Sequence, residues 1–216
     1  MPATPPSSAP NPAVAVLLAA GAGRRLGRGP KALLDHRGHP LVEHVVGVLL
    51  DGGCGTVVVV LGAEAERVRA AAALDAPGVR VVVNAGWTAG MASSLRAGVS
   101  AALEARAGEA PACLVVAHVD QPGVTSDDVA RLLGAHRAGR VTASRWAGAP
   151  QVDDVRPRWA HPLVLDAGLA GPAAASATGD AGARAFLRAH PELVDVVVHP
   201  GDGRDVDIEA DLDLLT

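Results

Sequence analysis

The chain has 216 residues, of which 49% are hydrophobic and 19% are charged, a balance typical of one globular domain with a proper core. Its formal net charge of −4 argues against a general nucleic-acid-binding protein, and no apolar run approaches the length of a membrane span. Aromatic residues make up only 2% of the chain, so we expect a core of alanine, valine and leucine.

Residues 1–12 are rich in proline and lack the positive and apolar regions of a signal peptide, which predicts a disordered tail. Residues 13–216 contain no repeat and no linker, so we expect a single domain. Cys54 and Cys113 form no C-x-x-C motif and are typical of small buried residues in a reducing compartment. These features favour a cytoplasmic protein.

Buried apolar segments alternate with segments of helical periodicity along most of the chain. Strands are expected at 14–20, 56–61, 79–83, 112–119, 141–146, 161–165 and 193–199. Helices are expected at 41–50, 64–74, 125–138 and 180–190, and after the loop that begins at 84. We also expect a hairpin at 32–40, a small-residue loop at 171–179, and a short strand followed by a helix from 205 onward. This alternation predicts a three-layer α/β sandwich with a mainly parallel, Rossmann-like sheet.

The first expected strand ends in a loop that is rich in glycine and strongly basic. Its glycines free the backbone to turn sharply and to bring N–H groups close to a ligand. Four side chains add positive charge: Arg24, Arg25, Arg28 and Lys31. Backbone donors combined with arginine and lysine suit a polyphosphate. The simpler alternative is a basic surface turn after a strand.

Two familiar phosphate-binding loops do not match this stretch. The dinucleotide pattern G-x-G-x-x-G requires glycine in the sixth place, where this chain has Leu26. The Walker pattern requires Gly-Lys followed by Ser or Thr, whereas Lys31 follows Pro30 and precedes Ala32.

The stretch instead resembles the L-A-A-G-x-G-x-R-x-G…P-K signature of the MobA-like nucleotidyltransferases. The residues that match in place are Leu18, Ala19, Ala20, Gly21, Gly23, Arg25, Gly27, Pro30 and Lys31. The resemblance covers nearly the whole chain from Val14 onward and implies the fold of the nucleotide-diphospho-sugar transferases. It also implies that this loop binds a nucleoside triphosphate, with Arg25 and Lys31 as catalytic cations.

Residues with special chemistry follow four of the expected strands, at Gly21, Gly62, Asn84 and Asp120. Ligands of such sheets bind outside the carboxyl ends of the strands, so we expect these four positions to share one site.

The stretch 84–98 is similar to the N…W…G-M…S-S-L…G pattern of the branch that includes the molybdenum-cofactor cytidylyltransferases. Ser93 and Ser94 lie near a helix N-terminus, which favours anions, and Gly90 lets the backbone approach a ligand. The alternative is a helix cap in which Trp87 and Met91 fill the core. The residues expected to contact the nucleotide are Leu18, Ala19, Ala20, Gly21, Gly23, Arg24, Arg25, Lys31, Gly62, Asn84, Gly90, Ser93 and Ser94.

The sequence Val-Asp-Gln-Pro at 119–122 resembles the family's Gly-Asp-Gln-Pro, which implies that Asp120 binds a metal ion and is catalytic; Asp120 could also simply cap a turn. Oxygen ligands of this kind suit Mg²⁺, with Mn²⁺ as an alternative. The C-terminal D-V-D-I-E-A-D-L resembles the family's D-I-D-T-P-E-D-L, which implies a second metal carboxylate. We favour Asp207 over Asp205 for that role. Val119 replaces the family's glycine, and Ile208 and Glu209 replace Thr-Pro.

Two further matches fall in the C-terminal half. Ala-His-Pro at 160–162 and Gly-Asp-Ala-Gly-Ala-Arg at 179–184 resemble the family's G-H-P and G-D-x-G-A-R segments. The resemblance implies that His161, Asp180 and Arg184 lie on the acceptor side of the site.

The resemblance implies transfer of a nucleoside monophosphate, CMP from CTP before GMP from GTP, to a phosphorylated small molecule such as molybdopterin. Pyrophosphate would be released, and a molybdoenzyme would be the protein partner. Alternatives are guanylyl transfer, a different phosphorylated acceptor, or a catalytically weak relative that binds nucleotide and acts as a regulatory partner. Val119 and the altered C-terminal motif keep the last alternative open. The sequence contains no H-E-x-x-H and no G-x-S-x-G motif that would indicate other chemistry.

Overall fold

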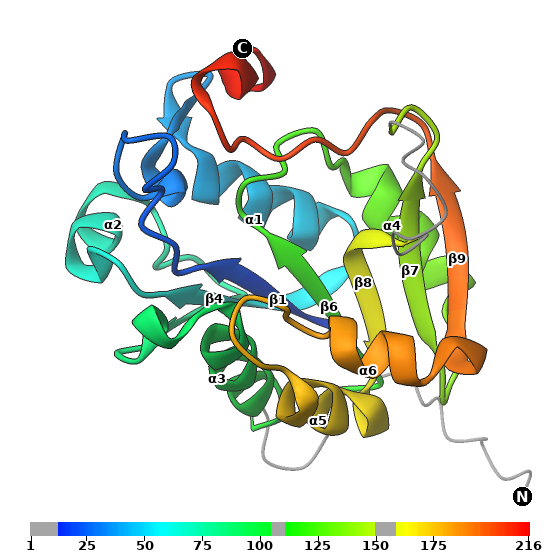
Figure 1. Cartoon of the computed structure of the whole chain (residues 1–216). Coiled ribbons are helices and arrows are strands. Elements are labelled where there is room, and N and C mark those ends of the chain that lie inside the picture. Colours follow the sequence, from blue (N-terminus) through cyan, green and yellow to red (C-terminus); the bar gives the residue numbers. More distant parts are fainter. Residues whose placement is uncertain (1–12, 105–110, 150–158) are drawn as a thin grey trace, which may run out of the picture.

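The computed structural model describes residues 13–104, 111–149 and 159–216 (Figure 1). The predicted disordered tail at 1–12 lies outside the described residues, as does most of the stretch at 147–160 where the sequence pattern is lost. Within the described residues, no helix is both long enough and apolar enough to cross a bilayer.

The centre of the fold is a seven-stranded sheet with the strand order β5-β4-β1-β6-β8-β7-β9. Its strands are β1 (Ala13–Ala19), β4 (Cys54–Leu61), β5 (Val79–Val83), β6 (Cys113–His118), β7 (Val141–Trp146), β8 (Ala160–Asp166) and β9 (Val194–His199). Only β8 runs against its neighbours, β6 and β7, and every other pairing in this sheet is parallel. A separate hairpin, β2 (Asp35–His36) and β3 (His39–Pro40), precedes the first helix. The predicted mainly parallel sheet is confirmed.

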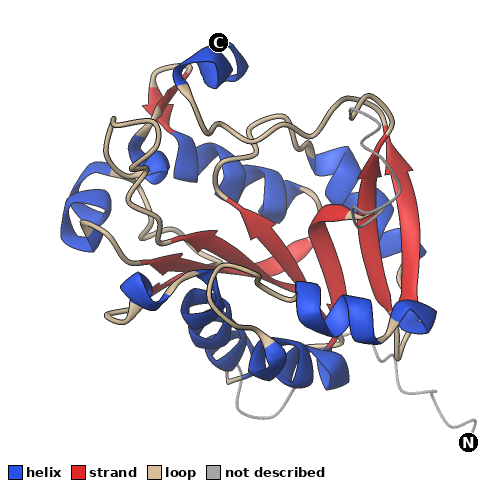
Figure 2. Ribbon diagram, in the orientation of Figure 1, coloured by secondary structure: helices blue, strands red, loops and turns tan. Residues whose placement is uncertain are grey.

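Helices cover both faces of this sheet, so the fold has three layers (Figure 2). One face carries α1 (Leu41–Asp51), α2 (Ala65–Ala71) and α4 (Ser126–Ala135). The other carries α3 (Met91–Leu103), α5 (Ala167–Ser176) and α6 (Arg184–Ala189). Short 3-10 turns complete the chain: η1 (Lys31–Leu33), η2 (Trp87–Ala89), η3 (Pro191–Leu193) and η4 (Glu209–Leu215).

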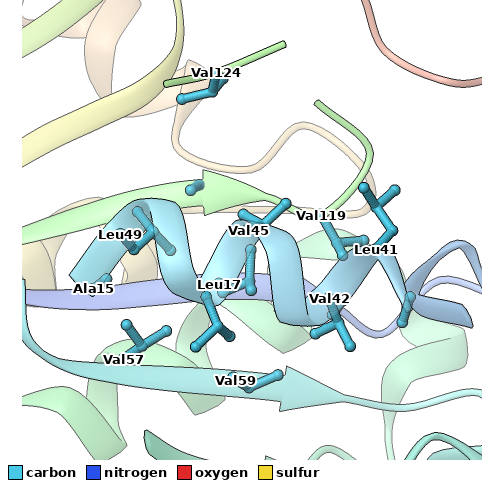
Figure 3. Packing of buried hydrophobic residues seen from close by; sticks show 14 of the residues in the cluster. Ala15, Leu17, Leu41, Val42, Val45, Leu49, Val57, Val59, Val119 and Val124 are labelled. Atoms are coloured by element: carbon cyan, nitrogen blue, oxygen red, sulfur yellow. The ribbon is translucent and has the colours of Figure 1, made fainter. Parts of the chain in front are cut away.

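The strands read as continuous apolar runs because both of their faces are buried. In β1, Ala15 and Leu17 face α1, while Val14 and Val16 belong to the cluster on the α3 side. Figure 3 shows α1 laying Leu41, Val45 and Leu49 over β1 and β4. The expected core of alanine, valine and leucine is therefore present on both sides of the sheet.

Three predicted boundaries are wrong. The loop expected at 171–179 is mostly helix α5, because Asp166 caps its first turn through the Gly168 N–H (2.9 Å) and small alanines suit a helix packed closely on α3. The helix expected from 180 begins at Arg184. The segment from Asp205 forms no strand in the described structure, although Val206 N donates to the Asp120 carbonyl at 2.8 Å.

Both cysteines are buried free thiols, as expected from the sequence. Burial raises the pKa of Cys54 to about 12 and the pKa of Cys113 to about 11, so both remain protonated and unreactive at neutral pH.

Helix α3 approaches the sheet so closely that Gly98 cannot carry a side chain. A Cβ atom at Gly98 would lie 2.4 Å from Val16 Cγ1 and 2.8 Å from Val60 Cγ2. By contrast, a Cβ atom at Gly47 in α1 would have nothing within 4 Å.

We therefore expect Gly98→Ala to lower the free energy of unfolding by about 1–3 kcal/mol, because it overpacks the contact between α3 and β1. The matched variant Gly47→Ala should raise it by about 0.5–1 kcal/mol, since the helix gains alanine at no steric cost. Urea denaturation measures both values. Equal stability of the two variants would contradict the close approach of α3.

Candidate functional site

A cavity of about 360 Å³ opens at the carboxyl ends of β1 and β6. Its walls come from β1 and the glycine loop, from η2 and the start of α3, from the end of β6, and from the loop before α6. The lining residues are Leu18, Ala20, Gly21, Ala22, Gly23, Arg24, Lys31, Trp87, Thr88, Gly90, Met91, Ser94, His118, Val119, Asp120 and Asp180. Segments from both halves of the chain therefore share one pocket, as expected for a sheet of this type.

The glycine loop after β1 folds back on itself. Gly27 N donates to the Gly23 carbonyl at 3.0 Å, and Gly23 has the positive φ of 61° that favours glycine. A Cβ atom at Gly23 would lie 2.1 Å from the Gly29 carbonyl oxygen. Glycine is therefore required at position 23 by a backbone contact within the loop itself.

Three of the four basic side chains of this loop form ion pairs with carboxylates that are distant in sequence. Lys31 Nζ donates to Asp120 Oδ2 at 2.7 Å and also to the Asp207 carboxylate. Arg25 Nη1 lies 3.4 Å from Asp207 Oδ2, and Arg28 forms an ion pair with Glu209. Figure 1 shows the C-terminal segment crossing above the end of β6 to reach the loop.

Lys31 is the most protected of these cations, with only 14% of its side chain exposed. Burial opposes its charge, but the Asp120 and Asp207 carboxylates outweigh burial and raise the pKa of Lys31. The side chain is therefore a fixed positive charge on the floor of the pocket.

Three carboxylates, those of Asp120, Asp205 and Asp207, gather around Lys31. Asp120 Oδ1 is buried and has no hydrogen-bond partner among the described residues. Partial removal from water, reinforced by Asp120 and Asp207, raises the pKa of Asp205 to about 6, although this residue stays exposed at the surface. An unpartnered carboxylate oxygen beside two more carboxylates is a donor set that suits a hard divalent cation. The described residues hold no ready-made group of three metal ligands, and the Lys31 ammonium bridges Asp120 and Asp207.

Val119, which replaces the family's glycine, is accommodated without disturbing Asp120. Its side chain is 5% exposed and packs into the core near α1 (Figure 3), and its N–H donates to the Leu18 carbonyl at 3.1 Å. The strand end therefore tolerates a side chain at this position.

The hydrogen-bond donors at and near the start of α3 already have acceptors within the protein. Asn84 Nδ2 donates to Ser93 Oγ at 2.8 Å and to Ser94 Oγ at 3.0 Å. Asp180 Oδ1 accepts from Met91 N at 3.1 Å, and the Gly179 carbonyl accepts from Ala92 N at 2.8 Å. This helix N-terminus is thus capped by the loop before α6, and an anion would have to compete with Asp180 for it.

His118 lines the part of the pocket near β8, and His161, which lies outside the lining, stacks on it. The His118 and His161 rings stack with their centroids 4.0 Å apart, because the antiparallel register of β6 and β8 brings their positions opposite each other. Burial lowers the pKa of both imidazoles, and Arg184 lowers them further, so both rings are neutral at neutral pH. His118 Nε2 is buried and has no hydrogen-bond partner among the described residues.

Sequence analysis missed His118. The available signal was its position: His118 is the last residue of the strand β6, and ligands of such sheets bind at the carboxyl ends of the strands.

Of the predicted site residues, some line the pocket and others lie outside its lining. Those that line it are Leu18, Ala20, Gly21, Gly23, Arg24, Lys31, Gly90, Ser94, Asp120 and Asp180. Those outside the lining are Ala19, Arg25, Gly62, Asn84, Ser93, His161, Arg184, Asp205 and Asp207. The roles of both groups remain predictions.

The raised pKa of Asp205 makes stability depend on pH. Protonated Asp205 favours folding: this contribution is fully present below about pH 4 and is lost as the pH rises through about 6. We expect Asp205→Asn to stabilise the protein at pH 7 by at most about 1 kcal/mol, since solvent screens an exposed carboxyl, and to have no effect near pH 4. Thermal unfolding of both proteins across this range measures the difference. A stability gain of Asp205→Asn that persists at pH 4 would contradict the raised pKa of Asp205.

Solved structures of other proteins share this architecture. Rv0371c from Mycobacterium tuberculosis H37Rv superposes with a TM-score of 0.76 at 27% identity, covering 96% of this chain and 98% of that one. The same protein has been solved in complex with manganese. A nucleotidyl transferase from Methanothermobacter thermautotroptrophicus superposes with a TM-score of 0.76 at 24% identity, over 95% of this chain and 96% of that one, and so shares the fold.

One curated relative is much more similar in sequence. Nicotine blue oxidoreductase from Paenarthrobacter nicotinovorans is 48% identical over 196 residues, which are 89% of this chain and 90% of that protein. The family model described as the MobA-like NTP transferase domain matches residues 15–194. The expectation from the glycine loop is confirmed: this chain belongs to the MobA-like NTP transferase family, a family of nucleotidyltransferases.

Proposed function

We propose that residues 13–216 act as one divalent-metal-dependent nucleotidyltransferase. The enzyme would transfer a nucleoside monophosphate, CMP from CTP in the first instance, to a phosphorylated small molecule such as molybdopterin. The observation that carries the proposal is the Lys31 ammonium, which joins the glycine loop to Asp120 and Asp207 at one pocket. A molybdoenzyme would then be the protein that receives the product.

The reaction requires no protein nucleophile. A phosphate oxygen of the acceptor attacks the α-phosphorus of the triphosphate, a new P–O bond forms, and the bond to the bridging oxygen breaks to release pyrophosphate. Arg25 and Lys31 would neutralise charge on the triphosphate and on the leaving group; Lys31 lines the pocket, and Arg25 lies in the same loop. Catalysis of this kind consists of positioning and charge neutralisation.

Asp120 and Asp207 would hold the metal ion, with Asp205 as the alternative to Asp207. The unpartnered Asp120 Oδ1 supports this assignment, and the Mycobacterium relative solved with manganese supports a divalent cation. When bound, Mg²⁺ or Mn²⁺ would neutralise the phosphate oxygens as a Lewis acid. Lys31 would exchange a carboxylate contact for a phosphate contact.

The acceptor would lie toward β8, beside His118, Asp180 and Arg184, with His161 supporting the ring of His118. The base would lie near Ala20 and Trp87. Neither Ala20 nor Trp87 carries a charge that would distinguish cytosine from guanine, so GTP stays the first alternative to CTP.

Asp120 provides the sharpest test. We expect Asp120→Asn to reduce metal-dependent pyrophosphate release from CTP by about 100-fold or more, because it removes a charge that would hold the metal. Asp75→Asn is the matched control, since Asp75 is exposed and does not line the pocket. A colorimetric phosphate assay coupled to pyrophosphatase measures the release. Normal turnover by a folded Asp120→Asn protein would overturn the metal assignment.

A second candidate function is oxidoreduction, which the 48% identity to nicotine blue oxidoreductase favours. Because the buried thiols of Cys54 and Cys113 have raised pKa values, electrons would have to come from a bound carrier. A nicotinamide dinucleotide carries a diphosphate that the glycine loop could bind.

The two candidates differ in what they consume. A transferase should release pyrophosphate from CTP or GTP and leave reduced nicotinamide dinucleotides unchanged, even when a soluble quinone is present as electron acceptor. The loss of reduced-nicotinamide absorbance measures the second reaction. Enzyme-dependent loss of that absorbance, without pyrophosphate release from any triphosphate, would replace the first candidate with the second.

A further inference from the structure

We propose that Trp87 is the platform on which the nucleobase stacks, and that Arg24 joins this base platform to the phosphate-binding loop. The inference rests on the proposed function, because it takes the ligand to be a nucleotide. It assigns a ligand-binding role to Trp87, for which the simpler interpretation is that its side chain fills the core.

Trp87 lies at the wall of the pocket rather than in the core. It begins η2, which follows β5 after a short turn, and it is only partly buried. Of the described residues that line the pocket, Trp87 and His118 alone carry rings. One face of the His118 ring is already covered by His161, so Trp87 is the ring that remains to contact a flat ligand.

The backbone around Trp87 holds the indole in a fixed place. A Cβ atom at Gly62 would lie 2.6 Å from Trp87 Cβ and 2.8 Å from Ala20 Cβ, so the glycine lets η2 pack directly against the end of β4. Trp87 N donates to the Asn84 carbonyl at 3.2 Å, and Asn84 N donates to the Leu61 carbonyl at 2.8 Å. Gly62 and Asn84 therefore act on the ligand through the position of Trp87.

Arg24 is the basic residue of the glycine loop that faces this ring. Its guanidinium carbon lies 5.9 Å from the centroid of the Trp87 ring. No carboxylate in the described part of the chain pairs with Arg24, whereas Arg25, Arg28 and Lys31 all have such partners. Its charge thus remains available to a phosphate, while its guanidinium lies over the indole ring.

This arrangement provides separate contacts for the two ends of a nucleotide. The face of an indole can stack on any nucleobase, because every base has a π-face. The glycine loop and Arg24 bind the phosphates. Removing the ring should therefore weaken binding of a nucleotide but not of its phosphate chain alone.

The experiment is isothermal titration of the whole protein with CTP, GTP and inorganic tripolyphosphate, each with Mg²⁺. We expect Trp87→Leu to weaken binding of the nucleotides about tenfold or more and to leave tripolyphosphate binding within about twofold. Trp87→Phe, which keeps a ring, should retain most of the nucleotide affinity. Arg24→Ala should weaken all three ligands, whereas Arg69→Ala, a matched exposed arginine in α2 that is paired with Glu66, should change little.

The outcomes separate this inference from the proposed function. Wild-type protein that binds neither nucleotide nor tripolyphosphate overturns both. Wild-type protein that binds a nucleotide, with Trp87→Leu binding it equally well or losing tripolyphosphate to the same extent, overturns only the role of Trp87. If Trp87→Leu does not fold, wild-type fluorescence decides: a saturating nucleotide must quench tryptophan emission that tripolyphosphate leaves unchanged, and equal emission with both ligands overturns the inference.

Discussion

The ion cluster around Lys31 is the interaction on which the rest of the site depends. One ammonium group contacts Asp120 at the end of β6 and Asp207 in the C-terminal segment, 176 residues away from Lys31. Without that positive charge, the carboxylates of Asp120, Asp205 and Asp207 would repel each other more strongly; the pKa of Asp205 is raised first by desolvation and then by the charges of Asp120 and Asp207. Because the lysine side chain is largely shielded from water, the attraction is stronger than in an ordinary surface ion pair. The position of the C-terminal segment therefore follows from the charge on the glycine loop.

The sequence predicts what depends on local pattern. Continuous valine and leucine runs reveal the strands because both faces of the sheet are covered, and the glycine loop is recognisable because its turns need positive φ angles. The α5 helix escapes prediction because its small residues lack a clear apolar period and only their contact with α3 shows their purpose. His118 escapes because its partner, His161, meets it across an antiparallel strand pair that no local pattern specifies. The pairing of Arg28 with Glu209 has the same cause, since it joins residues 181 positions apart.

The comparison with nicotine blue oxidoreductase shows how little of a scaffold fixes its chemistry. That relative shares nearly half of its residues with this chain over most of both lengths, and this chain belongs to a nucleotidyltransferase family. Both facts are compatible if reactivity depends on the few side chains at the strand ends and not on the helices and strands that position them. In the function that we propose for this chain, those side chains are the two aspartates beside Lys31, the histidine pair, and Trp87 with Arg24.

The reversed strand β8 has a consequence for how such a protein diversifies. Strands β1 and β6 bring residues to the pocket at their ends, whereas β8 supports one of those residues from its own beginning, because His161 stacks on His118. Mutations near the start of β8 would therefore change the support of His118 and leave the glycine loop unchanged. In the transferase that we propose, acceptor binding could then change while nucleotide binding is preserved, and the two parts of the site could be randomised independently.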